Sequence, residues 1–148
     1  MADQEENRQL EVASSPHLRD EDNIERIMYH VLVALLPAVA ASIYFFGWQA
    51  VRLYVLSVAA AEVSEVICLR ARGRSLSAAV DGSALVTGLL LAMIIPPSAP
   101  WYCAVVGSAF AIFIAKHTFG GLGCNIWNPA LSGRIFLQFA WPMSISKS

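Results

Sequence analysis

Long apolar segments, interrupted by glycine, proline and charged residues, make up most of the chain after residue 26. Residues 27–46 include only His30 and Ser42 as clearly polar side chains. About 20 apolar residues are what a helix needs to cross about 30 Å of hydrocarbon, so this segment is predicted to be a transmembrane helix. Pro37 lies inside it. Neighbouring helices in a bilayer can satisfy the carbonyl that proline frees, so we expect a kink rather than a helix end.

Two more segments are long enough for predicted spans. Residues 49–69 are followed at once by an arginine cluster, Arg70, Arg72 and Arg74. Excess arginine marks the cytoplasmic face. Two predicted spans separate the arginine cluster from the polar and acidic N-terminal tail, residues 1–26, so the tail lies on the same face. Residues 101–116 form the third predicted span. The end of the chain, 143–148, is polar, and we expect the chain to be incomplete.

Two shorter apolar segments, 83–95 and 129–141, cannot cross a bilayer as helices. At 1.5 Å per residue, each reaches only about 20 Å. Asp81 or Ser83 is suited to cap the first, and Asn128 before Pro129 is typical of a helix start. We therefore predict two half-helices whose starts lie close together near the bilayer midplane. Their free amides suit an anionic group or a polar cofactor edge, although simply packed re-entrant segments remain an alternative.

A glycine-rich stretch, 116–134, joins the last full span to the second half-helix. Its glycines lack the preceding strand and the spacing of a dinucleotide-binding motif. A non-helical stretch at membrane depth is tolerated only where protein or a cavity covers it. We predict that it forms part of a pocket wall together with the first half-helix. The candidate residues are Ser83, Thr87, Gly120, Gly121, Gly123, Asn125 and Asn128.

Few acidic residues occur in the apolar body. Eight of the 11 precede residue 27, which leaves Glu62, Glu65 and Asp81. Glu62 and Glu65 are three residues apart and share one side of their helix, with Glu62 the deeper of the two. Intramembrane carboxylates are costly and often functional, so an ion path through these three residues is one interpretation. A structural pair that reaches toward the arginine cluster is the other.

Composition limits the possible functions. Hydrophobic residues make up 57% of the chain and charged residues 14%, against about 45–50% and 25% in soluble domains. The net charge of −1 and the lack of a long basic run give no reason to expect nucleic acid as a partner. The three cysteines are too far apart for a metal motif, so we expect no metal site and free thiols. We favour structural roles for His30 and His117, and roles as anchors reaching the membrane surface for Lys116 and Arg134.

Three motifs are specific enough to indicate a family. They are DGSALVTGLLLA at 81–92, PPSAPW at 96–101 and KHTFGGLGCNIWNPALSGR at 116–134. Together they resemble the N-terminal half of the D subunit of Rnf-type electron transport complexes. The B subunit of sodium-translocating NADH:quinone oxidoreductase is similar in the same places. The resemblance runs collinearly over residues 27–142.

The resemblance implies an all-α polytopic membrane protein, with one urea-transporter-like repeat of about three full transmembrane helices and two half-helices. It also implies a subunit of an oxidoreductase linked to ferredoxin or NADH, which translocates sodium or protons across a bacterial or archaeal cytoplasmic membrane. Expected partners are other membrane subunits, a flavoprotein subunit and the lipid bilayer. Family members carry flavin mononucleotide (FMN) on a threonine that belongs to a second repeat, so neither Thr87 nor Thr118 is assigned as the attachment site. We expect no complete catalytic site in this chain.

Two other functions stay open at this point. A small-solute channel or transporter of the urea-transporter type would use the same broken helices without redox chemistry. A purely structural assembly subunit is the third interpretation.

Overall fold

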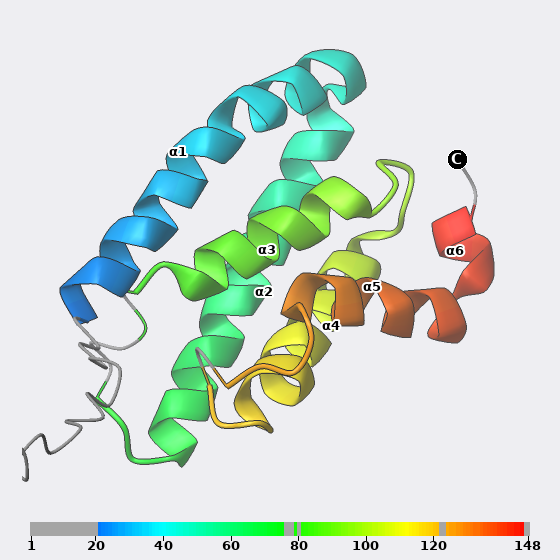
Figure 1. Ribbon diagram of the computed structural model, residues 1–148. Helices are drawn as coiled ribbons and strands as arrows, with labels where there is room; N and C mark the ends of the chain where they lie inside the picture. The colour runs from blue at the N-terminus through cyan, green and yellow to red at the C-terminus, as the bar shows by residue number, and fades with distance from the viewer. Residues whose placement is uncertain (1–20, 76–78, 80, 122–123, 147–148) are drawn as a thin grey trace, which may run out of the picture.

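A computed structural model describes residues 21–75, 79, 81–121 and 124–146 of the 148-residue chain. The described part is helical and contains no strand. The first two helices, α1 (Glu21–Phe46) and α2 (Trp48–Ala71), form an antiparallel hairpin (Figure 1). They are joined at Gly47, whose φ of 61° lies in the left-handed region that glycine adopts without strain.

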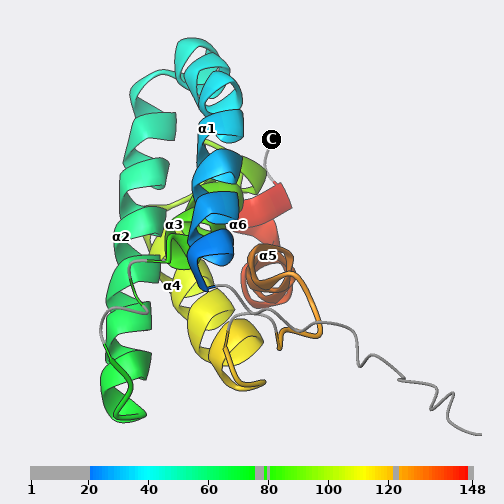
Figure 2. The ribbon, with the colours of Figure 1, turned by 60° about the vertical axis from the view of Figure 1, so that its left-hand side comes forward.

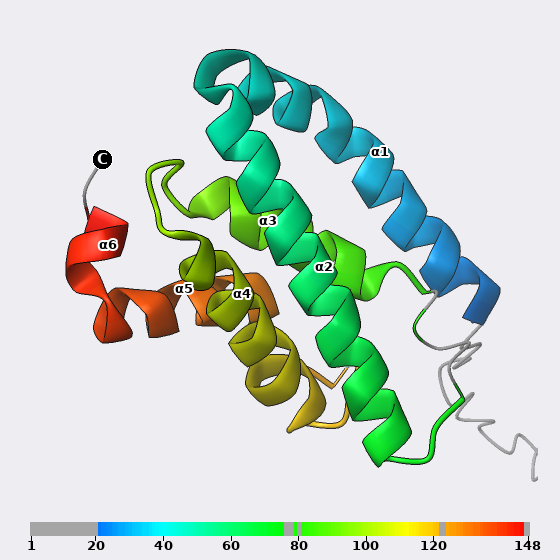
Figure 3. The same cartoon turned by 180° about the vertical axis from the view of Figure 1, so that it is seen from behind.

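Helices α3 (Ser83–Ile94), α4 (Trp101–Phe110) and η2 (Ala111–His117) pack against α2, and α5 (Pro129–Ala140) packs against these three in turn. Helix α4 continues without a break into the π-helix η2, and the short α6 (Pro142–Ser146) follows α5. Seen from behind, α2 passes in front of α3 and beside α4 (Figure 3). Helices α3 and α5 run in the same direction, with their N-terminal ends on the same side (Figures 1 and 3).

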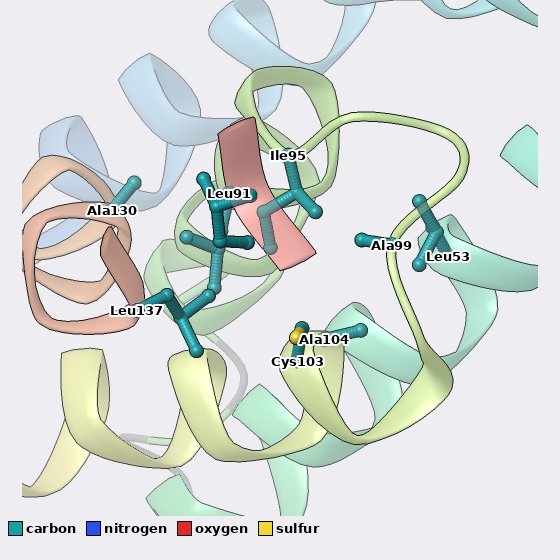
Figure 4. Packing of buried hydrophobic residues seen from close by; sticks show 9 residues of the cluster. Leu53, Leu91, Ile95, Ala99, Cys103, Ala104, Ala130 and Leu137 are labelled. Atoms are coloured by element: carbon teal, nitrogen blue, oxygen red, sulfur yellow. The ribbon is translucent and has the colours of Figure 1, made fainter. Parts of the chain in front are cut away.

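The core lies where α2, α3, α4 and α5 meet, and its side chains are small or aliphatic. Figure 4 shows Leu91 and Leu137 pointing toward each other between these helices. Glycine makes this close packing possible. A Cβ added to Gly88 of α3 would lie 2.8 Å from the Cα of Val58 in α2, and one added to Gly133 of α5 would lie 2.7 Å from the carbonyl oxygen of Gly107 in α4. Close approach through small residues is the usual packing of membrane helices.

Helix α1 lies on the outside of the bundle, beside α2 (Figure 2). Among the described helices, one segment, Arg26–Phe46, is both long and apolar enough to cross a membrane. None of the residues in its most apolar stretch is buried. Large side chains at its end are strongly exposed, among them Tyr44 at 84% and Phe45 at 76%. An apolar helix so largely exposed is suited to contact lipid.

The helix boundaries agree closely with those predicted. The chain continues as a helix through Pro37, and α1 begins at Glu21, somewhat earlier than the predicted span. Helices α3 and α5 have 12 residues each, about 18 Å at 1.5 Å per residue, which confirms that both are short. The all-helical class is confirmed for the described residues. The number of complete spans and the urea-transporter-like repeat stay predictions.

Two features were not predicted. Residues 111–117, at the end of the third segment and one residue beyond it, form a π-helix, and a short helix, α6, occupies much of the end that was expected to be only polar. Pro142 ends the helix before it but suits the first turn of the next, where its missing N–H costs nothing. Ile145 of α6 is buried in the core, at 4% exposure. The predicted tail falls largely on residues 1–20, outside the described residues.

Candidate functional site

A buried ionic cluster is centred on Glu65 of α2, whose exposure is 2%. One carboxylate oxygen, Oε1, lies 2.9 Å from Nζ of Lys116, and the other, Oε2, lies 2.9 Å from Nε2 of His117. Lys116 and His117 are buried as well, at 1% and 5% exposure. Charged groups removed from water in this way are stable only when each has partners, so this contact ties η2 firmly to α2.

Two consecutive residues of the π-helix reach one carboxylate. In an α-helix, neighbouring side chains diverge by about 100° around the axis. The π-helix has i→i+5 hydrogen bonds and therefore a wider turn, which reduces that angle. Lys116 and His117 are the last two residues of η2, and both face Glu65. Short π segments are frequent at functional sites, which makes this cluster a candidate for one.

The cluster extends from Lys116 to the start of α3. Nζ of Lys116 donates to Oγ of Ser83 at 2.6 Å, and that hydroxyl donates to Oδ1 of Asp81 at 2.7 Å. The same Asp81 oxygen accepts the backbone N–H of Ser83 at 2.9 Å. One chain of polar contacts thus connects α2, η2 and α3, with an acidic group at each end.

Glu62 lies one turn before Glu65 and has a different environment. Its Oε1 is buried with no hydrogen-bond partner among the described residues. Its carboxyl group faces the backbone amide of Leu85 in the first turn of α3, within electrostatic range of Glu65, Asp81 and Lys116. A buried carboxylate oxygen without a donor is expensive, so Glu62 has free capacity to bind a proton or a cation.

The charges in this region do not balance. Three carboxyl groups, Glu62, Glu65 and Asp81, surround one ammonium group, that of Lys116. Nε2 of His117 contacts the second oxygen of Glu65, and its buried Nδ1 has no hydrogen-bond partner among the described residues. The carboxyl groups outnumber the ammonium group, so an additional cation or proton would be favourable here.

Both half-helix starts are capped by the chain's own side chains. Oδ1 of Asp81 accepts a hydrogen bond from the amide of Ser83. Oδ1 of Asn128 accepts from the amides of Ala130 and Leu131 at 2.9 and 3.4 Å. The predicted Asn128 cap is confirmed, whereas the N-cap residue of α3 is Gly82, and Asp81 before it accepts the first amide of the helix. The expectation that these amides are free for an outside anion is wrong for these three, since side-chain oxygens occupy them.

The other candidates for a pocket wall have varied environments. The hydroxyl of Thr87 is buried and donates to the carbonyl of Ser83 at 2.9 Å. Gly120 and Gly121 have φ values of 121° and 102°, which few other residues tolerate. Oδ1 of Asn125 is buried without a partner among the described residues. Gly123 lies outside the described residues. Their joint role as a wall, and the midplane position of the helix starts, stay predictions.

Two sequence interpretations need correction. Lys116 is not an anchor reaching the membrane surface, because it is buried against Glu65. Glu65 does form a structural pair, but with Lys116 and His117 rather than with the arginine cluster. His117 has the predicted structural contact. The arginine cluster lies beside the same segment, since the Arg72 guanidinium donates to the His117 carbonyl, so residues 70–74 and 116–121 share one end of the molecule.

The contact between Glu65 and Lys116 was missed although one signal was available. Lys116 is the first charged residue in the chain after Asp81 and ends an apolar run. Glu65 and Lys116 are therefore two isolated opposite charges in apolar segments, and burial favours the pairing of such charges. Among the described residues, no group of three or more His, Cys, Asp or Glu side chains is arranged to hold a metal ion. A cation in this region would meet single carboxylates rather than a closed site.

Comparison with known proteins gives consistent matches. Residues 11–147 match the model of the NQR2, RnfD, RnfE family. Over 124 residues the chain is 48% identical to the D subunit of the ion-translocating oxidoreductase complex of Stutzerimonas stutzeri, a match that covers 84% of this chain and 35% of that protein. Over 136 residues it is 46% identical to the protein of the same name from Salmonella typhimurium, covering 91% of this chain and 39% of the relative. The chain thus spans between a third and two fifths of the length of these relatives.

Proposed function

The chain belongs to the NQR2, RnfD, RnfE family, and on that premise we propose that it acts as a membrane subunit of an ion-translocating oxidoreductase complex. The observation that carries the proposal is 46% identity over 91% of the chain to a protein named as the D subunit of such a complex. No observation favours the alternative of a solute channel without a redox role. Electron transfer belongs to the assembled complex, in which this chain supplies part of the membrane domain.

Within that complex, we propose that the carboxyl groups around Glu65 form part of the ion path. Glu62 supports this role because its buried Oε1 lacks a partner among the described residues, whereas Glu65 is saturated by Lys116 and His117. An entering sodium ion or proton would neutralise the excess negative charge of the region. Glu65 holds the surrounding helices in place, and Asp81 adds to the negative potential at the start of α3.

The FMN implied by the family does not fit the start of α3. Asp81 places a carboxylate at the start of α3, which would repel a flavin phosphate, and the Thr87 hydroxyl is buried inside that helix. We therefore assign the covalent flavin to residues outside this chain. The proposed partners are the other membrane subunits and a flavoprotein subunit of the complex.

The proposed location is the cytoplasmic membrane, with the N-terminus and the arginine cluster on the cytoplasmic side. The exposed apolar surface of α1 supports contact with lipid. The arginine cluster, residues 70–74, supports the orientation, because positively charged loops stay on the cytoplasmic side.

Assembly is tested by affinity purification of a tagged chain from its native membranes in a mild detergent. The proposal predicts that flavin-containing oxidoreductase subunits co-purify in fixed proportion and that the preparation absorbs near the flavin maximum. Purification of the chain without redox subunits, from membranes that contain them, would contradict it.

Glu62 is the first residue to test in the ion path. Glu62→Gln removes the charge while keeping the shape of the side chain. We expect ion uptake per electron transferred to fall by about tenfold, the effect of one lost charged contact worth about 1.4 kcal/mol. Glu65→Gln is the matched control, with a smaller effect on this ratio once the amount of assembled complex is equalised. Unchanged coupling in both variants would remove these residues from the path.

A further inference from the structure

A cavity of about 250 Å³ lies far from the ionic cluster, near the N-terminal turns of α2. Leu53 of α2 lines it, 12 residues or about 18 Å along the helix from Glu65. The other walls come from the end of α1, the C-terminal end of α3 with the Pro96-Pro97 turn, α5 and α6. Most lining side chains are apolar, and none of the predicted pocket-wall residues is among them.

Arg134 of α5 brings a positive charge to the wall of this cavity. It is half-buried, no acidic residue lines the cavity, and Arg134 has no ion-pair partner in the described part of the chain. Tyr54, 8% exposed, also lines the cavity, and its buried hydroxyl has no hydrogen-bond partner among the described residues. An unpaired cation and an unsatisfied hydroxyl at one cavity are best explained by an anionic ligand rich in oxygen.

Exposed aromatic residues indicate the depth of the cavity in a membrane. Tyr44 and Trp48 flank the cavity residue Phe46 in sequence and are 84% and 78% exposed. Trp101, which follows the Pro96-Pro97 turn, is 59% exposed. Tyrosine and tryptophan gather at the level of lipid headgroups, so the cavity lies at that level too.

We propose that this cavity binds the phosphate group of an anionic phospholipid. The Arg134 guanidinium donates to the phosphate oxygens, a pairing that its planar geometry favours, and the Tyr54 hydroxyl donates to an oxygen of the headgroup. A volume of about 250 Å³ is smaller than most pockets that enclose a whole ligand, about 300–1,000 Å³. The acyl chains therefore lie outside, along the apolar surface. This inference concerns a lipid site and is independent of the redox role.

The test is a titration of the purified full chain, in a zwitterionic detergent, with phosphatidylglycerol. Thermal unfolding is followed, and native mass spectrometry counts the bound lipid. We expect saturable stabilisation by phosphatidylglycerol, weakened about tenfold in Arg134→Gln, because one charge-assisted contact is lost. Arg52→Gln is the matched control, since Arg52 lies at the same end, contacts the Ala99 carbonyl at 3.5 Å and does not line the cavity.

Four outcomes would overturn the proposal. Equal stabilisation by phosphatidylcholine would show that the cavity does not require a lipid with a net negative charge. Equal stabilisation by inorganic phosphate alone would indicate a site for a free anion. Unchanged lipid affinity in Arg134→Gln would exclude Arg134. A structure of the assembled complex with a protein side chain in the cavity would identify a different occupant. If Arg134→Gln does not fold, Arg134→Lys, which keeps the charge but loses the planar geometry, must still bind more weakly than the unsubstituted chain.

Discussion

Glu65 is the residue on which the ionic cluster depends. Each of its two carboxylate oxygens has its own partner, and both partners come from η2. Lys116 in turn connects to Ser83 at the start of α3. Burial makes each of these contacts stronger than on a surface, and it also makes the loss of one partner costly, because the other charge stays behind without compensation.

Replacement of Lys116 tests this dependence. Lys116→Met keeps the length of the side chain but leaves Glu65 with only His117 as a partner. We expect a loss of about 3–5 kcal/mol in the free energy of unfolding, measured by denaturant titration in detergent micelles. The double variant Glu65→Gln with Lys116→Met should recover much of that loss, since no buried charge is left unpaired. A double variant less stable than Lys116→Met alone would argue against the pairing.

Only some of the side-chain contacts in the ionic cluster and at the helix starts could be predicted from the sequence. The spacing of Glu62 and Glu65 indicated that they share one side of a helix, and Asn128 before Pro129 indicated a cap, because both signals are local. The contact between Glu65 and Lys116 joins positions far apart in sequence. Such a contact depends on which helices pack together, and the hydrophobic pattern of a membrane segment is too uniform to show that.

At the scale of helices, glycine sets how closely the bundle packs. Gly88 lets α3 approach the backbone of α2, and Gly133 lets α5 approach the backbone of α4. At Gly107 the nearest neighbour of an added Cβ is instead the Cδ1 atom of Leu137, at 2.6 Å. A flexible side chain can move aside, whereas a packed backbone cannot without separating the two helices.

This difference predicts an order of stability for two glycine variants. Gly88→Ala should lower the free energy of unfolding by about 1–3 kcal/mol, because it forces α3 away from α2. Gly107→Ala should cost less, since Leu137 can change its rotamer. Thermal unfolding of the two variants in the same detergent measures the order. A greater loss in Gly107→Ala than in Gly88→Ala would contradict the packing described for α2 and α3.

Helix ends were easier to predict than helix type. Proline, glycine and the Asn128 cap act within one turn, so the bounds of α3 and α5 follow from sequence alone. The π-helix at the end of α4 does not, because no local signal distinguishes its residues from those of an α-helix. Lys116 and His117 of this π-helix contact Glu65, which belongs to another helix, α2. A sequence pattern within η2 cannot show such a contact.

At the scale of the whole molecule, the two ends of α2 have different chemistry. One end carries the ionic cluster and the arginine cluster, residues 70–74, beside the 116–121 segment. The other end carries exposed aromatic residues and the cavity lined by Arg134. This difference between the two ends is consistent with the proposed ion path near one membrane face and the proposed lipid contact near the other.

The most direct test of the central claim is redox-driven ion uptake into inverted membrane vesicles from the source cells. Vesicles with the chain, without its gene and with the gene restored are compared while ferredoxin or NADH supplies electrons, and both sodium uptake and acidification of the lumen are followed. The account predicts that uptake of one of these ions disappears without the chain and returns with it. Electron-driven uptake that is equal with and without the chain would contradict the account.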